Sequence, residues 1–504
     1  MFRRIIESGS TAILKSTIPC YTVPALSSLL TGTNPGRHGM LSVTKSDGVP
    51  TILTGMKYPK FWNVLDKGGF KSCIVGVRAT YPPEKLNGIM ISGSVPSDKS
   101  DYTYPKRLKE KFKFEDDEHT KMILNLRNKK RSKNFRLKLV ELICEQTKRR
   151  YDIFKKLNQE ENYDFSMYWI EETDIIQHFL WEYKDSLFQF YSRLDNILGD
   201  ILSTFNDRTL FVVSDHGFEA SPSQYFFMNS WLQKEGYLII KRMIPITLVN
   251  FGLTLGFKTI GVLARGGLRR FEKLLSSILL LYSKANNDLL DKEIAIRRIN
   301  VPGIDKKKST AYLYTPYGIK INKTKNYETI REEIIQKLPK IENHDGEKII
   351  KNVWKREEIY EGEYSNELPD VVFLTSEKYE IFPLVTKNYF SSNKNNRFFW
   401  WDSGAHGNAI DGILLAYGPE VRKKQNLGAV RIEDIFPTIL HVMGCTIPDH
   451  VNGNILMSIF EKNSEPANRK PCFQKYINFT KDNLELEKDD AIKIRLKLRD
   501  LGYI

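Results

Sequence analysis

Short apolar runs that end in polar clusters recur along the chain, and they predict buried parallel strands. A continuous apolar run is typical of a strand that is covered on both faces. The five runs lie at Ser72–Val77, Phe165–Asp174, Thr209–Gly217, Pro369–Leu374 and Gly412–Gly418.

Helical patterns lie between these runs. In Leu187–Leu202 the apolar positions 187, 190, 191, 194, 197, 198 and 201 follow the helical period. Strands that alternate with helices predict an α/β fold with a mainly parallel central sheet and helices on both faces. In such sheets ligands gather outside the carboxyl ends of the strands, where the polar clusters stand.

Two stretches interrupt this rhythm and are expected to be insertions. Residues 103–160 are highly charged and indicate a helical insertion, and residues 240–304, apolar and then basic, indicate a cap. The core α/β structure is expected over 1–102, 161–239 and 305–460, followed by a C-terminal helix and tail over 461–504.

The most apolar run, Leu248–Ala264, is marginal as a membrane span, because it holds Asn250, Lys258 and three glycines. It is expected to form a buried or lid helix. Because arginines follow it, contact of 248–270 with a membrane surface is the alternative.

Composition narrows the class of protein only a little. With 41% hydrophobic and 27% charged residues, the chain is an ordinary globular one of 504 residues. A net charge of +15 suits a phosphorylated substrate, nucleic acid or an anionic membrane, and no nucleic-acid recognition motif is present. The five cysteines are scattered and form no CxxC pair, which argues against a disulfide framework or thiolate zinc site and predicts a reducing, cytoplasmic location.

Thr22 stands where a helix is expected to begin, in the stretch Cys20–Gly32. One interpretation is structural: Thr22 caps the helix, and Pro24 fits its first turn. The other is a nucleophile, because unpaired N–H groups and the helix dipole favour an anion such as phosphate at that position.

Carboxylates and imidazoles at predicted strand ends are candidate metal ligands. Asp174 and His178 are four residues apart, so a helix would place both on one face; Asp215 and His216 end another run, and His406 lies in a glycine-containing loop. This ligand set, without thiolates, suits zinc, manganese or iron. Two such ions could clamp a phosphoryl group and lower the pKa of the Thr22 hydroxyl.

Several motifs together resemble the type I phosphodiesterase/nucleotide pyrophosphatase family of the alkaline phosphatase superfamily. They are STIPCYTVPALSSLLTGTNPGRHGM, ETDIIQHFLW, VVSDHGF, SGAHGNAIDGILLAYGP and RIEDIFPTILHVMG. The resemblance implies an alkaline-phosphatase-like three-layer α/β/α sandwich, two divalent ions, and hydrolysis of phosphodiesters or phosphomonoesters, including nucleotide-like substrates.

The same resemblance assigns roles by position. Thr22 would form a covalent phospho-threonine. One ion would be held by Asp174, His178 and His406, and part of the other site would come from Asp215 and His216.

Two departures from the family pattern bear on activity. The family's first strand, which ends in a metal-binding aspartate, is not evident, since Met1 stands only 21 residues before Thr22. A truncated gene model is the favoured explanation. The alternative is a catalytically impaired relative that binds anions or a membrane surface. Ala25 stands where eukaryotic members carry a phosphate-binding asparagine, so Arg78 is the candidate anion contact in its place.

Overall fold

A computed structural model of the chain describes most of its residues. The described residues are 1–42, 50–53, 56–115, 117–127, 132–240, 304–386, 389–392, 403–475 and 486–501. They form two compact units, one of Met1–Ser223, Glu357–Leu368 and Asn393–Tyr503, the other of Gln224–Arg356 and Pro369–Ser392. The first unit carries all the predicted site residues.

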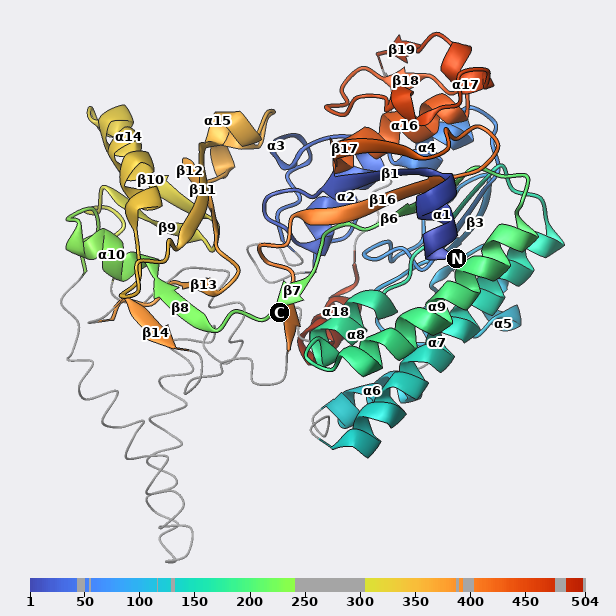
Figure 1. The fold of residues 1–504 in the computed structure, drawn as a ribbon, viewed down its shortest axis with the longest axis horizontal. Helices are drawn as coiled ribbons and strands as arrows, with labels where there is room; N and C mark the ends of the chain where they lie inside the picture. Colours follow the sequence, from blue (N-terminus) through green and yellow to red (C-terminus); the bar gives the residue numbers. More distant parts are fainter. Residues whose placement is uncertain are drawn as a thin grey trace, which may run out of the picture. The chain divides into compact units, whose positions relative to one another are not determined.

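Two four-stranded sheets organise the first unit (Figure 1). In one, the strand order is β17 (Gln425–Arg431), β1 (Ser10–Lys15), β16 (Asp411–Tyr417) and β6 (Leu210–Val213). In the other, it is β4 (Thr103–Tyr104), β3 (Gly88–Ile91), β2 (Ser72–Val75) and β5 (Phe165–Tyr168).

In each sheet three strands run in the same direction and one is reversed, which agrees with the expected mainly parallel α/β fold. β2 is parallel to both β3 and β5, and β1 is parallel to β17. However, β16 is antiparallel to both β1 and β6. A continuous apolar run indicates burial on both faces of a strand but not the direction in which the strand runs. The pattern of β16 therefore could not distinguish a parallel from an antiparallel strand.

Alternating side chains on β16 reach two cores, which confirms the α/β/α layering. Leu414 and Ala416 join the core built with α2 (Thr22–Thr31), α4 (Phe61–Lys67) and α16 (Ile435–Val442). Leu415 faces the opposite way, against α1 (Phe2–Ser8) and α9 (Lys184–Thr204). Successive strand residues point to opposite faces, so helices cover both sides of this sheet.

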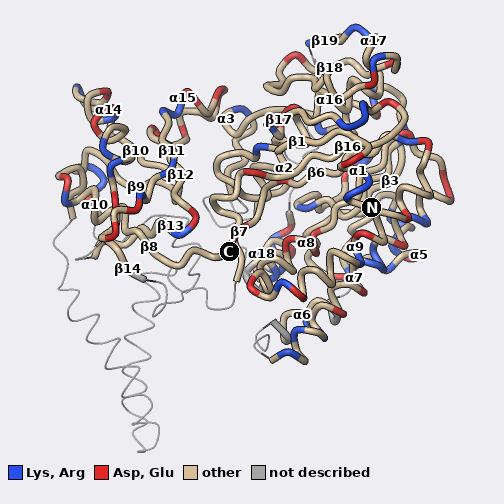
Figure 2. Tube along the Cα trace, in the orientation of Figure 1, with Lys and Arg blue, Asp and Glu red and all other residues tan. Residues whose placement is uncertain are grey.

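The helical predictions within this unit hold. The helix expected over Leu187–Leu202 is α9. The 103–160 stretch contains α5 (Leu108–Lys111), α6 (Asp117–Arg127) and α7 (Lys133–Glu160). Figure 2 shows Lys and Arg together with Asp and Glu along α7 and α9; on α7 the Lys and Arg residues outnumber the acids.

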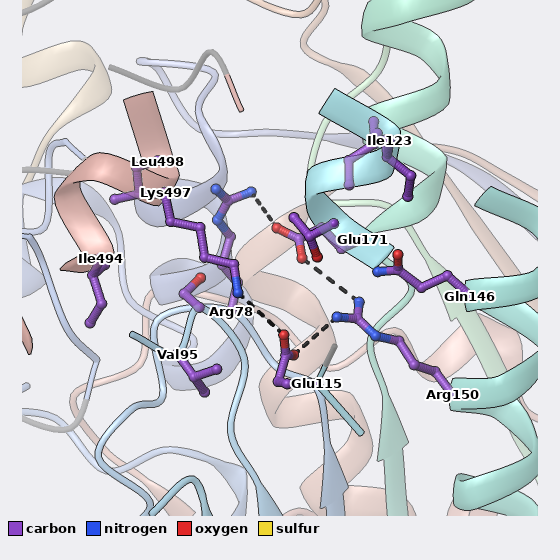
Figure 3. A pocket seen from close by; sticks show the side chains of 13 residues that line it. Arg78, Val95, Glu115, Ile123, Gln146, Arg150, Glu171, Ile494, Lys497 and Leu498 are labelled. Atoms are coloured by element: carbon purple, nitrogen blue, oxygen red, sulfur yellow. Dashed lines mark hydrogen bonds and ion pairs between the residues drawn. The ribbon is translucent and has the colours of Figure 1, made fainter. Parts of the chain in front are cut away.

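The C-terminal helix α18 (Lys488–Leu501) returns to the first unit. Its Lys497 Nζ lies 3.4 Å from Glu115 Oε2 (Figure 3), and Asp490 accepts a hydrogen bond from the hydroxyl of Tyr81. Short elements complete this unit: α3 (Pro35–His38), β18 (Ile447–Pro448), β19 (Phe473–Gln474) and α17 (Glu465–Asn468).

The second unit is built on an antiparallel sheet with the order β11 (Ile350–Lys355), β12 (Val371–Thr375), β10 (Gly318–Ile321) and β9 (Ala311–Thr315). The predicted strand at Pro369–Leu374 is β12, but it is antiparallel to both neighbours. Residues 305–356 and 369–392, expected within the core, therefore fold in this unit. It also holds β8 (Gln224–Phe227), β13 (Tyr379–Phe382), β14 (Phe390–Ser392), α10 (Met228–Lys234) and α14 (Tyr327–Lys337).

The predicted cap lies outside the described residues, apart from Ile240 and Ile304, which form an isolated bridge. The run Leu248–Ala264 and the proposed membrane contact of 248–270 are likewise outside them. Over the part of the chain that is described, no helix has both the length and the apolar character needed to cross a bilayer.

Strands β5 and β6 deliver the predicted ligands. Each stands at the end of its sheet, and no ladder joins them in the described structure. Arg208, just before β6, donates hydrogen bonds to Tyr163 O and Asn162 Oδ1, each at 2.7 Å, just before β5. The two strands therefore start close together.

A buried ion pair under α4 allows a stability prediction. Lys60 Nζ lies 2.9 Å from Glu84 Oε1, and both side chains are almost fully buried. We expect Lys60→Met to lower the free energy of unfolding by about 3–5 kcal/mol, because it leaves the Glu84 charge buried and unpaired. Lys60→Met with Glu84→Gln should recover most of the loss, since a glutamine oxygen can still accept from Trp62 Nε1, now 2.7 Å from Glu84 Oε2. Urea unfolding measures both; equal losses in the two variants would contradict the argument.

Candidate active site

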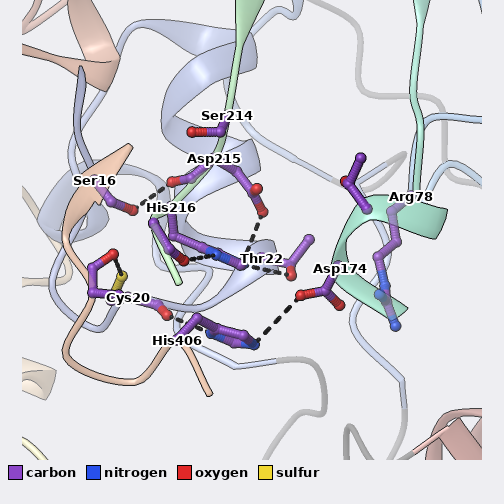
Figure 4. Close-up of polar contacts among 12 residues, drawn as sticks. Ser16, Cys20, Thr22, Arg78, Asp174, Ser214, Asp215, His216 and His406 are labelled. Atoms are coloured by element: carbon purple, nitrogen blue, oxygen red, sulfur yellow. Dashed lines mark hydrogen bonds and ion pairs between the residues drawn. The ribbon is translucent and has the colours of Figure 1, made fainter. Parts of the chain in front are cut away.

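Thr22 is the first residue of α2 and does not act as its cap. The N-cap is Tyr21, which makes no side-chain capping bond, and Pro24 lies in the first turn as predicted. The Thr22 side chain is buried, and its Oγ1 lies 3.4 Å from His216 Nε2 (Figure 4). The hydroxyl therefore faces the predicted ligands instead of its own helix.

Asp174, His178 and His406 form one compact group of donors. Asp174 and His178 share a face of α8 (Glu172–Leu180), which follows β5, and His406 follows the short strand β15 (Gly404–Ala405). One donor atom from each of the three lies within 4.8 Å of the other two. Asp174 Oδ1 is 3.5 Å from His178 Nε2 and 4.0 Å from His406 Nε2.

Asp215 and His216 follow β6 and form a second group beside the first. Asp215 Oδ2 lies 3.3 Å from His216 Nε2. The His216 and His406 rings stack with centroids 4.0 Å apart, so His406 links the two groups. Ser16 Oγ donates to the main-chain oxygen of Asp215 at 2.5 Å. All five predicted ligands and Thr22 thus come together.

Each of the three imidazoles is held by its Nδ1. The Nδ1–H groups donate to the main-chain oxygens of Gly404 (from His178, 3.0 Å), Cys20 (from His406, 3.1 Å) and Gly217 (from His216, 3.0 Å). A carbonyl can only accept, so Nδ1 carries the proton, and in the neutral form of each ring Nε2 carries the lone pair. Such bonds fix ring orientation in metal sites.

The electrostatics agree with this donor arrangement. Burial lowers the pKa of His406 well below its usual value and raises the pKa of Asp215, because charge is costly away from water. Asp215 Oδ2 is buried and has no hydrogen-bond partner among the described residues. A neutral imidazole and an unsatisfied carboxylate oxygen are suited to a cation.

The donor chemistry fits a divalent ion, although less fully in the second group. The first group offers two imidazole nitrogens and a carboxylate, which is a common protein ligand set for zinc. The second offers Asp215 and His216, with the Thr22 hydroxyl beside them.

Arg78 follows β2 and is buried, with its Nη1 3.1 Å from Glu171 Oε1. Its guanidinium is thus engaged by a carboxylate at the start of α8. Figure 4 draws it on the far side of Asp174 from Thr22.

Sequence reasoning missed the groups that orient the ligands. Main-chain oxygens of Cys20 and Gly404, and the Ser16 hydroxyl, carry no recognisable pattern in the sequence. Only Gly404 left a signal, as a glycine two residues before His406.

Gly404 is required by close packing, which gives a second prediction. A Cβ at this position would lie 2.6 Å from both Gln177 O and Phe218 Cε1, and 2.8 Å from Trp181 Cβ. We expect Gly404→Ala to lower the free energy of unfolding by about 1–3 kcal/mol and to weaken zinc binding, because β15 must move away from α8. Calorimetry and thermal melts measure this. Ala220→Ser, on the exposed strand partner of Gly404, is the control and should behave as wild type; a Gly404→Ala protein with unchanged zinc affinity would argue against the packing constraint.

Comparison with solved structures finds chains that are similar to this one. Among solved structures, the chain is similar to murine ectonucleotide pyrophosphatase/phosphodiesterase 5, with 13% identity, a TM-score of 0.48, and coverage of 91% of this chain and 94% of that one. An inactive variant of the murine protein in complex with AMP has 12% identity, a TM-score of 0.49 and the same coverage. The human protein has 13% identity, a TM-score of 0.46, and coverage of 92% and 94%. Comparison with curated protein sequences finds no significant match.

The family model that matches is that of type I phosphodiesterase / nucleotide pyrophosphatase, over residues 1–388. This span includes Thr22 and four of the five predicted ligands; His406 lies beyond it. The chain therefore belongs to the type I phosphodiesterase/nucleotide pyrophosphatase family of phosphoric ester hydrolases.

Proposed function

We propose that the protein is a metal-dependent hydrolase of phosphoric esters in which Thr22 is the nucleophile and becomes transiently phosphorylated. The observation that carries this proposal is the position of the Thr22 hydroxyl, buried at the start of α2 and 3.4 Å from His216 Nε2 amid the predicted ligands. A hydroxyl used only for capping would bond to its own helix.

Asp174, His178 and His406 would hold one ion, and Asp215 with His216 the other, with zinc favoured and manganese or iron compatible. When bound, such ions supply Lewis-acid stabilisation of negative charge and favour ionisation of the Thr22 hydroxyl.

The residues of the chain account for the covalent step. The bond from Thr22 Oγ1 to phosphorus forms as the bond from phosphorus to the leaving oxygen breaks; the Thr22 proton is lost to solvent, and the leaving group departs as an oxyanion that takes its proton from water. Water then cleaves the threonine ester, and two inversions give net retention at phosphorus. The main-chain N–H groups of Thr22 and Val23 at the start of α2 would stabilise charge on the non-bridging oxygens; Pro24 has no N–H to contribute.

The proposed substrate is a phosphorylated small molecule, nucleotide-like or simpler. Ala25 is fully buried and has no polar group for phosphate, so a strict nucleotide preference is not assigned. Arg78 stays the proposed anion contact; its charge lies close enough to Asp215 to lower that carboxyl's pKa against the larger effect of burial. A cytoplasmic location is proposed because all five cysteines are free thiols.

A second candidate is an impaired relative that binds anions without turning them over. It is favoured by the second ligand group, which brings only two side chains together. The two candidates differ in a direct assay of the purified chain with bis-p-nitrophenyl phosphate and p-nitrophenyl phosphate, after chelation and re-addition of zinc or manganese. Metal-dependent release of nitrophenol is expected. Metal binding without turnover of either ester would favour the impaired relative.

A further inference from the structure

A group of buried charges joins the helical insertion to the first turn of α8. Arg150 of α7 places Nη1 2.8 Å from Glu172 Oε1 and Nη2 3.0 Å from Glu115 Oε1. The side chains of Arg150, Glu172 and Glu115 are 7%, 1% and 5% exposed, so they meet away from water. The Arg150 guanidinium also lies over the Phe114 ring, 4.8 Å from its centroid.

Further cations and carboxylates continue the group (Figure 3). Glu171, the N-cap of α8, lies between Arg78 at 3.1 Å and Arg150 at 4.0 Å. Lys497 of α18 reaches the other oxygen of Glu115. Cations and carboxylates therefore alternate from α18 to α8.

The space beside this group is too small for a substrate. The cavity lined by Arg78, Gln146, Arg150 and Glu171 holds about 30 Å³, which suffices for roughly one to three waters. Arg150 Nε and Gln146 Oε1 have no hydrogen-bond partner among the described residues, so water is the suitable occupant. Arg150 thus acts on the protein itself.

The carboxylates that Arg150 binds lie at the start of the helix that carries Asp174 and His178. Glu171 and Glu172 begin α8, Asp174 follows in the same turn, and His178 comes one turn later. A helix held at its first turn by two ion pairs has a defined rotation about its axis. Without Arg150, the buried Glu172 and the partly buried Glu171 would lie near Asp174 with less compensation of their charge, and repulsion would displace that turn.

We propose that Arg150 is a positioning residue: by holding Glu171 and Glu172 it fixes the orientation in which Asp174 and His178 face His406. The inference rests on the proposed function, because it concerns the proposed metal ligands. It gives the charged 103–160 stretch, an apparent insertion in the sequence, a direct part in the site.

The test compares zinc affinity by titration calorimetry with the melting temperature of the zinc-free protein. Arg150→Met alone leaves the buried Glu172 carboxylate without its cation and is expected to be destabilised. The double variant Arg150→Met/Glu172→Gln has no unpaired charge at position 172, so its melting temperature should return toward that of wild type. It still lacks the ion pairs between α7 and α8, so zinc should bind at least about 10-fold more weakly. Arg150→Lys keeps the positive charge but cannot bond to two carboxylates in the way that a guanidinium does. Its zinc affinity should therefore lie between those of wild type and the double variant. Lys148→Met, on an exposed pair of the same helix, should match wild type.

Zinc affinity that follows the melting temperature across these proteins, recovering fully in Arg150→Met/Glu172→Gln, would overturn the inference and leave Arg150 a structural residue. Should that double variant fail to fold, Arg150→Lys decides: weaker zinc binding at an unchanged melting temperature supports the inference, and wild-type affinity overturns it. A wild-type protein that binds none of zinc, manganese or iron removes the proposed function as well, whereas zinc binding that is equal in all variants removes this inference alone.

Discussion

Replacing Thr22 by alanine should abolish turnover and leave zinc binding intact. The hydroxyl is the proposed site of phosphorylation, and its side chain supplies no bond that holds α2 in place. Loss of a nucleophile removes the covalent route altogether, so kcat should fall by at least about 10⁴-fold. The measurement is hydrolysis of bis-p-nitrophenyl phosphate by zinc-loaded wild-type and variant proteins, with zinc affinity determined in parallel.

Two controls sharpen this result. Thr22→Ser keeps a hydroxyl at the same place and should retain measurable turnover together with a phosphorylated serine after acid quench. Thr446→Ala removes an exposed threonine of the same unit and should leave turnover and zinc affinity unchanged. Wild-type turnover by Thr22→Ala would remove the covalent mechanism while leaving the family assignment in place.

Replacing His406 by alanine should, in contrast, weaken zinc binding directly. Turnover should fall because the metal is lost. His406 belongs to the three-donor group and also stacks on His216 of the second group. Removing one of three donors from a closed site should weaken zinc binding by at least about 100-fold. Turnover at limiting zinc should fall accordingly.

Thermal melts provide a readout of this prediction that is independent of activity. A ligand that binds only the folded state stabilises it by about 2.7 kcal/mol at 100 times its Kd. Zinc should therefore raise the melting temperature of wild type and of Thr22→Ala, but not that of His406→Ala, and chelation should reverse the rise. His344→Ala, at an exposed histidine of the second unit, is the control. Equal zinc-induced shifts in His406→Ala and wild type would exclude His406 from the ligand set.

The residues of the site could be predicted from sequence because their chemistry is local. Asp174 and His178 share a helix face through their spacing alone. Thr22 could be placed at the start of a helix because Pro24 is accepted in the first turn of a helix but not in its interior. Asp215 and His216 follow an apolar run that had to be a strand. Periodicity likewise predicted α9 and the layering of helices over a sheet.

Strand direction and the grouping of segments were decided only in three dimensions. β16 and β12 are apolar because both faces are covered, and burial is the same whichever way a strand runs. Residues 305–356 resemble core α/β sequence locally. In the structure they pack with 224–240 and Pro369–Ser392, which places them in the second unit.

The sequence by itself identified the side chains proposed to bind a cation and to carry a phosphoryl group, because residue type and short spacing suffice to propose them. Only the tertiary structure decided how they are held. The Nδ1 bonds to Cys20, Gly217 and Gly404, and the ion pairs of Arg150 with Glu172 and Glu115, mostly join residues far apart in the chain. Such contacts depend on where main-chain oxygens and buried charges meet after folding, and no local pattern encodes that meeting.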